Sequence, residues 1–133
     1  MHAGGIQRER ALELDRANLF LEGILGSLGF AVVVLDAEQR IQLWNSWAAD
    51  LWGLRDHEVV GSPFLALDIG FPVEKLKEAI RAALATESHE SEVTTEAVNR
   101  RGRRFGCRVR VLPLHDGQAR PYGALLLMSD AGE

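Results

Sequence analysis

The first part of the chain has apolar residues at helical spacing. Between residues 8 and 28 they recur at intervals of three and four, at Leu14, Ala17, Leu21, Ile24 and Leu28. This is the spacing of a heptad seam, so residues 8–28 are predicted to form an amphipathic helix. The seam can pack on its own domain or pair with a second copy of the chain. Residues 1–7 carry no such pattern and are expected to be disordered or vector-derived.

Two short apolar segments after this helix predict a β-hairpin. Residues 31–36, AVVVLD, form an unbroken apolar run, which indicates a strand covered on both faces. Residues 41–44, IQLW, form a second strand, and the polar connection is short enough for antiparallel pairing. Asn45 stands where a helix N-cap is expected, and Gly53 stands where the helix SWAADLW would end in a left-handed residue.

A second helical stripe follows a stretch of turns. Residues 54–71 are punctuated by Gly61, Pro63 and Gly70 and are expected to form short turns. Pro72 suits the first position of a helix, because its ring fixes a helical φ. The apolar residues after it fall on one helical face, at Val73, Leu76, Ile80, Ala83 and Leu84.

The hydrophobic period changes to two after His89 and predicts a second hairpin. A three-residue loop at 100–102, with Gly102 left-handed, would make the numbers of paired residues sum to 202. This register also sets Glu92 opposite Arg110 as an ion pair. An exposed pair contributes only about 0.2–1 kcal/mol, so the apolar face is expected to fix the register. The apolar-face pairs would be Val93 with Val109, Thr95 with Cys107, and Ala97 with Phe105.

The last predicted strand, residues 121–129, is again apolar on both faces. Because only the first and last strands have this pattern, they are expected to be neighbours in the middle of one antiparallel sheet. The hairpin rich in Glu and Arg would lie to one side, with its outer face in water. The predicted fold class is α+β.

Composition narrows the function classes. The 133 residues suit one domain, and a net charge of −4 argues against nucleic acid as a partner. No apolar run approaches the ~20 residues of a membrane span, and the first residues lack the apolar core of a signal peptide. Cys107 is the single cysteine, which fits the reducing cytoplasm.

Residues 31–64, AVVVLDAEQRIQLWNSWAADLWGLRDHEVVGSPF, resemble a PAS domain, the sensory module of bacterial signalling proteins. The ending LLLMSDAGE resembles the exit motif of that family, with Asp130 in place and Gly132 where a hydroxyl residue is usual. The resemblance covers residues 24–131. The positions that match the family pattern of turn, cap, small residues and Glu-x-x-Gly are Asp36, Asn45, Ala48, Ala49, Gly53, Glu58 and Gly61.

The resemblance implies a core over residues 29–131, with a five-stranded antiparallel sheet in the order 2-1-5-4-3. It places helices on one face of the sheet, a pocket between the two layers, and Asp130 at the signal exit. The residues expected to line the pocket are Leu43, Trp47, Leu76, Ile80, Val93, Cys107, Val109 and Leu125.

All three tryptophans, Trp44, Trp47 and Trp52, lie within nine residues and surround Asn45. Trp47 and Trp52 are five positions apart, so they point to different sides of their helix. One is expected in the core or pocket wall, and the other at least partly exposed. Packing is favoured over ligand stacking, and no basic groove supports nucleic-acid stacking.

The remaining residues do not predict catalysis or a metal site. The four histidines are spread along the chain without a ligand partner at helical spacing, and no nucleophile–base order or phosphate loop is present. Some PAS domains hold haem through a histidine on the long helix, and here only His89 is near. Light-sensing flavin relatives use an Asn-Cys-Arg-Phe motif, which is absent, so Cys107 is expected to be an apolar filler.

The expected function is a non-catalytic sensory domain of a larger cytosolic bacterial signalling protein. It would bind a small ligand or mediate dimerisation through the five seam residues, with no metal, nucleic acid or membrane as partner. The change would pass beyond Asp130 to an effector such as a histidine kinase, cyclase or methyltransferase. No cofactor is predicted; the alternative is a redox or gas sensor that holds haem or flavin.

Overall fold

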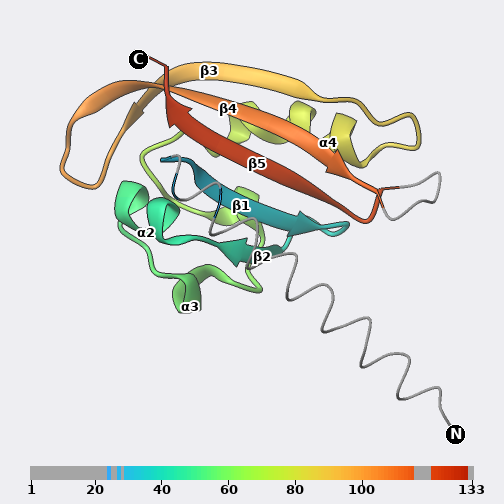
Figure 1. Ribbon diagram of the computed structural model, residues 1–133, viewed down its shortest axis with the longest axis horizontal. Helices are drawn as coiled ribbons and strands as arrows, with labels where there is room; N and C mark the ends of the chain where they lie inside the picture. Colours follow the sequence, from blue (N-terminus) through green and yellow to red (C-terminus); the bar gives the residue numbers. More distant parts are fainter. Residues whose placement is uncertain (1–23, 25–26, 28, 116–120, 132–133) are drawn as a thin grey trace, which may run out of the picture.

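A computed structural model describes residues 24, 27, 29–115 and 121–131 and has one five-stranded antiparallel sheet at its centre (Figure 1). The spatial order is β2-β1-β5-β4-β3, as the sequence predicts. The strands are β1 (Ala31–Asp36), β2 (Ile41–Trp44), β3 (Ser91–Val98), β4 (Arg104–Leu114) and β5 (Gly123–Asp130).

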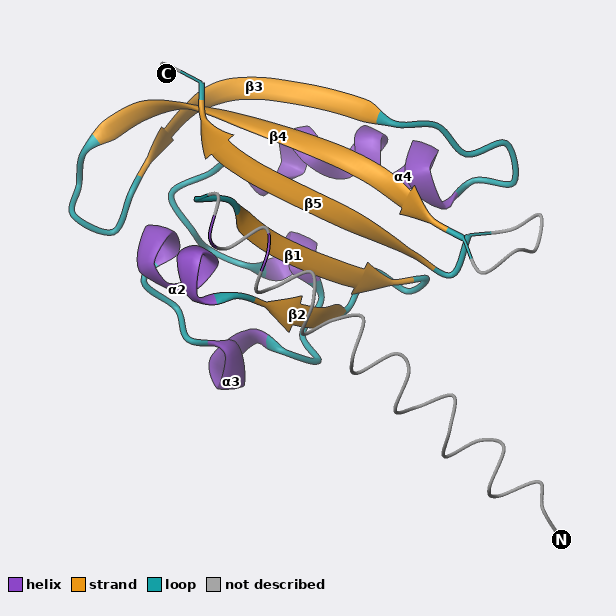
Figure 2. Ribbon diagram, in the orientation of Figure 1, coloured by secondary structure: helices purple, strands orange, loops and turns teal. Residues whose placement is uncertain are grey.

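Short helices cover one face of this sheet (Figure 2). Helix α2 packs mainly on β1, whereas α4 packs on β3, β4 and β5. The helical elements are α2 (Ser46–Trp52), α3 (Asp56–Val59), the 3-10 turns η1 (Phe64–Ala66) and η2 (Val73–Leu76), and α4 (Lys77–Leu84). None of the helices in the described part of the chain has the length and apolarity that crossing a bilayer requires.

The second helical stripe begins differently from the prediction. Pro72 precedes the first helical residue rather than occupying it, and residues 73–76 form a 3-10 turn before α4 starts at Lys77. The predicted apolar face is nevertheless the buried one, with Val73, Leu76 and Ile80 in the core. The stripe therefore fixes which face packs, whereas the winding of the first turn depends on local geometry.

The central strands β1 and β5 are side by side over six residue pairs. Pairs such as Val33 with Leu126 face the helices, and the alternate pairs face the other side of the sheet. Val32 and Val34 are buried in a second cluster on that other side. Both faces of the central strands are thus covered, which explains why their sequences do not alternate.

The β3–β4 hairpin has the predicted register. Val93 pairs with Val109, Thr95 with Cys107, and Ala97 with Phe105. At the turn, the Asn99 N–H donates to the Arg103 carbonyl at 3.0 Å, and Gly102 has φ 80°. The left-handed glycine therefore closes the loop as the sequence requires.

The predicted ion pair of this hairpin is wrong in detail. Glu92 and Arg110 are opposite one another in the backbone, but Arg110 binds Glu90, and Glu92 lies 3.8 Å from Arg108. Each arginine reaches a glutamate displaced by two residues, because the strands twist and a long side chain can span the diagonal. The hydrogen bond to Glu90 raises the pKa of the Arg110 guanidinium.

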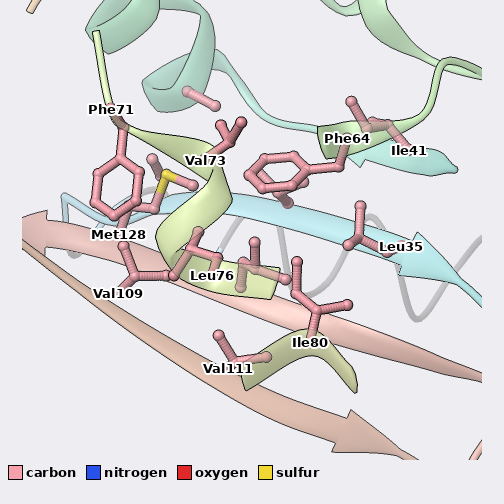
Figure 3. Close-up of a cluster of buried hydrophobic side chains, with 14 of the residues drawn as sticks. Leu35, Ile41, Phe64, Phe71, Val73, Leu76, Ile80, Val109, Val111 and Met128 are labelled. Atoms are coloured by element: carbon pink, nitrogen blue, oxygen red, sulfur yellow. The ribbon is translucent and has the colours of Figure 1, made fainter. Parts of the chain in front are cut away.

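Side chains fill the space between the helices and the sheet (Figure 3). Phe64 and Phe71 are fully buried there, together with Leu76 and Ile80 from the helical layer. Val109, Val111 and Met128 meet them from β4 and β5. The sequence analysis expects a pocket in this layer, but these residues fill it as a packed hydrophobic core.

The side chain of Asn45 joins the sheet to α2. Its Oδ1 accepts the Val32 N–H at 2.9 Å and the Ala48 N–H at 3.0 Å, and its Nδ2 donates to the Phe30 carbonyl at 3.0 Å. Asn45 is only 1% exposed, so its amide has no access to water as an alternative partner. The predicted helix cap is therefore also an anchor for the start of β1.

The other residues of the predicted structural motif shape turns. Asp36 Oδ1 accepts the N–H groups of Glu38 and Arg40, both at 2.9 Å, and so closes the β1–β2 connection. Gly53 ends α2 with φ 80°, and Gly61 has φ 90°, conformations that disfavour residues with a Cβ.

We predict that Asn45→Asp destabilises the domain by roughly 2–3 kcal/mol, although the two side chains have the same shape. An aspartate keeps the two accepting contacts but turns the donor to Phe30 into a buried, charged acceptor. Chemical denaturation at pH 7 measures the loss. The deficit should shrink as the pH falls, because a protonated carboxyl can donate to the carbonyl and its folded-state pKa is raised.

The control is Ser46→Ala, which changes an exposed neighbour on the same turn and should stay within about 0.5 kcal/mol of the parent. Equal stabilities for Asn45→Asp and the parent at pH 7 would show that the donated bond to Phe30 contributes little.

Candidate functional site

The eight residues predicted to line a pocket do not lie in one place. Five of them, Leu76, Ile80, Val93, Cys107 and Val109, belong to the packed core on the helix side. Leu43 and Leu125 lie on the opposite face of the sheet, and Trp47 lies at the surface of α2.

Strand alternation explains the misplacement of Leu43 and Leu125. Both are backbone partners of Val34, which faces away from the helices. Paired residues in a sheet point to the same face, so all three share the outer cluster. The sequence gives both faces of β1 and β5 apolar residues, and therefore gives no signal to tell the inner face from the outer one.

The two tryptophans of α2 point to different sides, as their spacing predicts. Trp52 is 6% exposed and Trp47 is 46% exposed. The Trp52 indole lies between Phe71 and Phe105, with ring centroids at 6.3 and 6.0 Å, and its Nε1 lies 3.3 Å from the Met128 sulfur. Trp52 therefore links α2 to β4 and β5 through the core, whereas the Trp47 ring is available at the surface.

A groove of about 570 Å³ lies between α2, the β3–β4 turn and the end of β5. Figure 1 shows these three segments at the same end of the sheet. Its size is within the range of about 300–1,000 Å³ that is usual for small-molecule sites. The lining comprises Trp47, Asp50 and Leu51 of α2, Asn99, Arg103, Arg104, Phe105 and Gly106 of the hairpin, Met128, Ser129 and Asp130 of β5, and Gly29 and Ala31.

Contacts between α2 and the hairpin turn form one end of the groove. The Arg100 N–H donates to the Leu51 carbonyl at 3.0 Å, and the Arg100 guanidinium lies 3.6 Å from the Asp50 carboxylate. A Cβ on Gly53 would come within 3.1 Å of the Arg100 side chain, so a glycine allows this close approach. At the other end, the Ala131 N–H donates to the Gly106 carbonyl at 2.7 Å.

The groove has charges of both signs. Arg103 and Arg104 are exposed on the hairpin side, and Arg104 lies 4.0 Å from Glu96. Asp50 is engaged by Arg100, and Asp130 stands at the β5 end. For these arginines the sequence favours a solvated hairpin over an anion contact, because their proximity to α2 arises from tertiary packing.

Of the residues predicted for the signal exit and the dimer, two can be located. Asp130 ends β5 and lines the groove, next to Cys107 in the strand register. Ile24 is 45% exposed. Leu14, Ala17, Leu21 and Leu28, together with Gly132 of the exit motif, lie outside the described residues.

The histidines in the described part of the chain are separate from the groove. His57 is exposed in α3 and lies 3.9 Å from Asp56. His89 is an exposed loop residue, and His115 is hydrogen-bonded to Ser88 at 3.0 Å. Among the described residues, no group of three or more potential ligands is arranged to hold a metal ion. None of the three described histidines therefore belongs to such a group.

Comparison with known proteins identifies the family. A family model for the PAS fold matches residues 19–131, and a search of curated proteins finds no significant match. The chain belongs to the PAS family, a family of sensory and signalling modules. The sequence-based family assignment is thereby confirmed.

Solved structures share this fold at low sequence identity. A PAS domain of an HTR-like protein from Haloarcula marismortui has a TM-score of 0.60 and 19% identity, over 92% of this chain and 98% of that one. The LOV protein of Rhodobacter sphaeroides has a TM-score of 0.61 and 20% identity, over 79% of this chain and 62% of that one. The structure of VqmA bound to DPO has a TM-score of 0.69 and 16% identity, over 90% of this chain and 58% of that one. These values establish a common fold.

We predict that the Cys107 thiol is unreactive in the folded protein. The residue is fully buried, and this burial, with a smaller contribution from Asp130, raises its pKa to about 12. Labelling by a disulfide reagent at pH 8 should be at least about 100-fold slower than in the urea-unfolded chain, because the thiolate is the nucleophile. Folding should also lose stability as the pH rises toward 12, since the unfolded thiol ionises first.

Cys107→Ser supplies the unlabelled baseline for this measurement. Similar labelling rates in the folded and unfolded chains would mean that the thiol is accessible in the native state and that the β4–β5 region opens frequently.

Proposed function

We propose that this chain is a sensory and relay domain without catalytic activity, part of a larger cytosolic bacterial signalling protein. The observation that carries the proposal is the burial of both faces of the central strands β1 and β5. One face belongs to the core that adjoins the groove, and the other belongs to a second buried apolar cluster with partly exposed residues at its margin. Strand β5 then leads directly out of the domain.

The central strands provide a mechanical connection between these two faces. Six residue pairs join β1 to β5, and eight pairs join β5 to β4. Close-packed cores deform little, so a change in packing on one face shifts the strands that also form the other face. The last residues of β5 carry the shift past Asp130 to an effector, for which a histidine kinase, a cyclase or a methyltransferase are candidates.

Dimerisation would provide two arrangements of the paired chains, and the signal would change their relative populations. The heptad seam of residues 8–28 can pair two chains, and a ligand or partner would bias two arrangements of the dimer. The outer cluster also has partly exposed members, Leu43, Leu112 and Leu127, against which a paired helix could pack. The homodimer is therefore the form in which the relay is proposed to operate.

We predict that Leu21→Glu converts a dimer to a monomer, because it places a charge in the middle of the seam. Sedimentation equilibrium measures the mass. In the same samples, backbone amides of β5 near its exit should exchange about tenfold faster in the monomer, which corresponds to about 1.4 kcal/mol of local stability.

Arg16→Glu introduces the same side chain at a c position, on the side of the helix away from the five seam residues, and should remain dimeric. A monomeric parent at high concentration would refute the dimer. A dimer that dissociates while β5 exchange stays unchanged would instead refute the relay through β5.

The alternative is a sensor that holds haem or flavin. The likeness to LOV domains is the specific observation that favours flavin as the one to test first. The described residues on the helix side are already packed around Phe64 and Phe71, so either group would require repacking of this core. We expect a visible spectrum of the purified protein without a flavin or Soret band; either band would favour the alternative.

A further inference from the structure

We propose that the groove beside α2 is a binding site for a small aromatic carboxylic acid, with its ring against Trp47 and its carboxylate at Arg103. The groove lies at the end of the sheet, outside the packed layer between helices and sheet in which the sequence analysis expected a pocket. Binding at this site does not depend on the relay through β5, so the two proposals can fail separately.

The apolar part of the groove fits a planar ring. Trp47 contributes an indole that is 46% exposed, a large aromatic surface left in contact with water. Phe105 and Met128 line the groove and also contact Trp52, which continues the apolar surface into the core. A ring that stacks on Trp47 would remove apolar area from water on both partners, and offset stacking adds to that gain.

The polar part of the groove favours an anion at the hairpin end. Arg103 forms no ion pair with another described residue, and this exposed residue lines the groove beside Arg104. A guanidinium presents paired donors whose geometry matches a carboxylate, which makes arginine the usual partner for that group.

The ion pairs around the groove favour a ligand with one carboxylate. The Asp50 carboxylate is held 3.6 Å from Arg100, which offsets its charge on the α2 side. Arg104 lies 4.0 Å from Glu96, whereas Arg103 forms no ion pair with another described residue. A ligand with one carboxylate next to its ring therefore suits the groove better than a dicarboxylate.

The position of the groove gives occupancy a structural consequence. The end of β5 forms part of the lining of the groove through Met128, Ser129 and Asp130. The next residue, Ala131, donates its N–H to the carbonyl of Gly106, which also lines the groove. A ligand in the groove would thus contact the segment that leaves the domain. It would also lie across the contact between α2 and the hairpin turn.

The test uses quinoline-2-carboxylate as the probe, with quinoline-2-carboxamide as the neutral analogue and cyclohexanecarboxylate as the non-aromatic analogue. Titration calorimetry gives the affinities, and the indole N–H signal of Trp47 in a ¹H–¹⁵N spectrum reports the location. We expect the carboxylate to bind at least tenfold more tightly than either analogue and to shift the Trp47 signal more than those of Trp44 and Trp52.

Variants assign the contacts. Arg103→Gln should weaken the probe about tenfold, the loss expected for one charge-assisted contact. Arg101→Gln is the matched control, because Arg101 lies in the same turn but does not line the groove. Trp47→Ala removes the reporting indole, and in calorimetry it should weaken binding of the probe, whereas Trp47→Phe should retain most of the affinity.

Several results would overturn the proposal. These are equal affinity for the carboxylate and the carboxamide, equal losses in Arg103→Gln and Arg101→Gln, or no binding by the parent at millimolar probe. If Trp47→Ala does not fold, as judged by circular dichroism, the arginine pair still decides. Binding without any change in β5 amide exchange would support the site and count against the relay.

Discussion

The buried amide of Asn45 is the contact on which the arrangement of the site depends. The amide connects the backbone at the start of β1 with the first turn of α2. In addition, the backbone N–H of Asn45 donates to the Val32 carbonyl. Its amide binds three backbone groups, of which the N–H groups of Val32 and Ala48 would otherwise be buried without partners. The direction of α2 relative to the sheet is fixed at this point.

That direction determines which tryptophan enters the core. With α2 anchored at its first turn, Trp52 faces the sheet and packs among Phe71, Phe105 and Met128, whereas Trp47 stays at the surface. The same placement brings the last turn of α2 to the β3–β4 turn, where Arg100 binds Leu51 and Asp50. The groove thus results from three features, namely the helix cap at Asn45, the buried ring of Trp52 and the contact of Arg100 with the last turn of α2.

Much of the fold could be predicted from local sequence. The hairpin register follows from the alternation of apolar residues and from Gly102, because a slip by one residue would expose the whole apolar face. The site could not be predicted in the same way. Leu43 and Leu125 were assigned to the pocket although they face the opposite side, since an apolar strand does not reveal its inner face. For the arginines of the hairpin, the sequence favours a solvated face over an anion contact, because the approach of Arg103 to α2 depends on two elements that are far apart in the chain.

The sequence by itself determined the sheet order through the family resemblance, the pairing of β3 with β4, the cap at Asn45 and the opposite directions of Trp47 and Trp52. These features depend on periodicity and on residues close together in the chain. Only the tertiary structure decided that side chains fill the layer under the helices and that a groove lies beside α2. The physical reason is that the volume between packed elements depends on how side chains from distant segments interlock, and no local pattern specifies that sum.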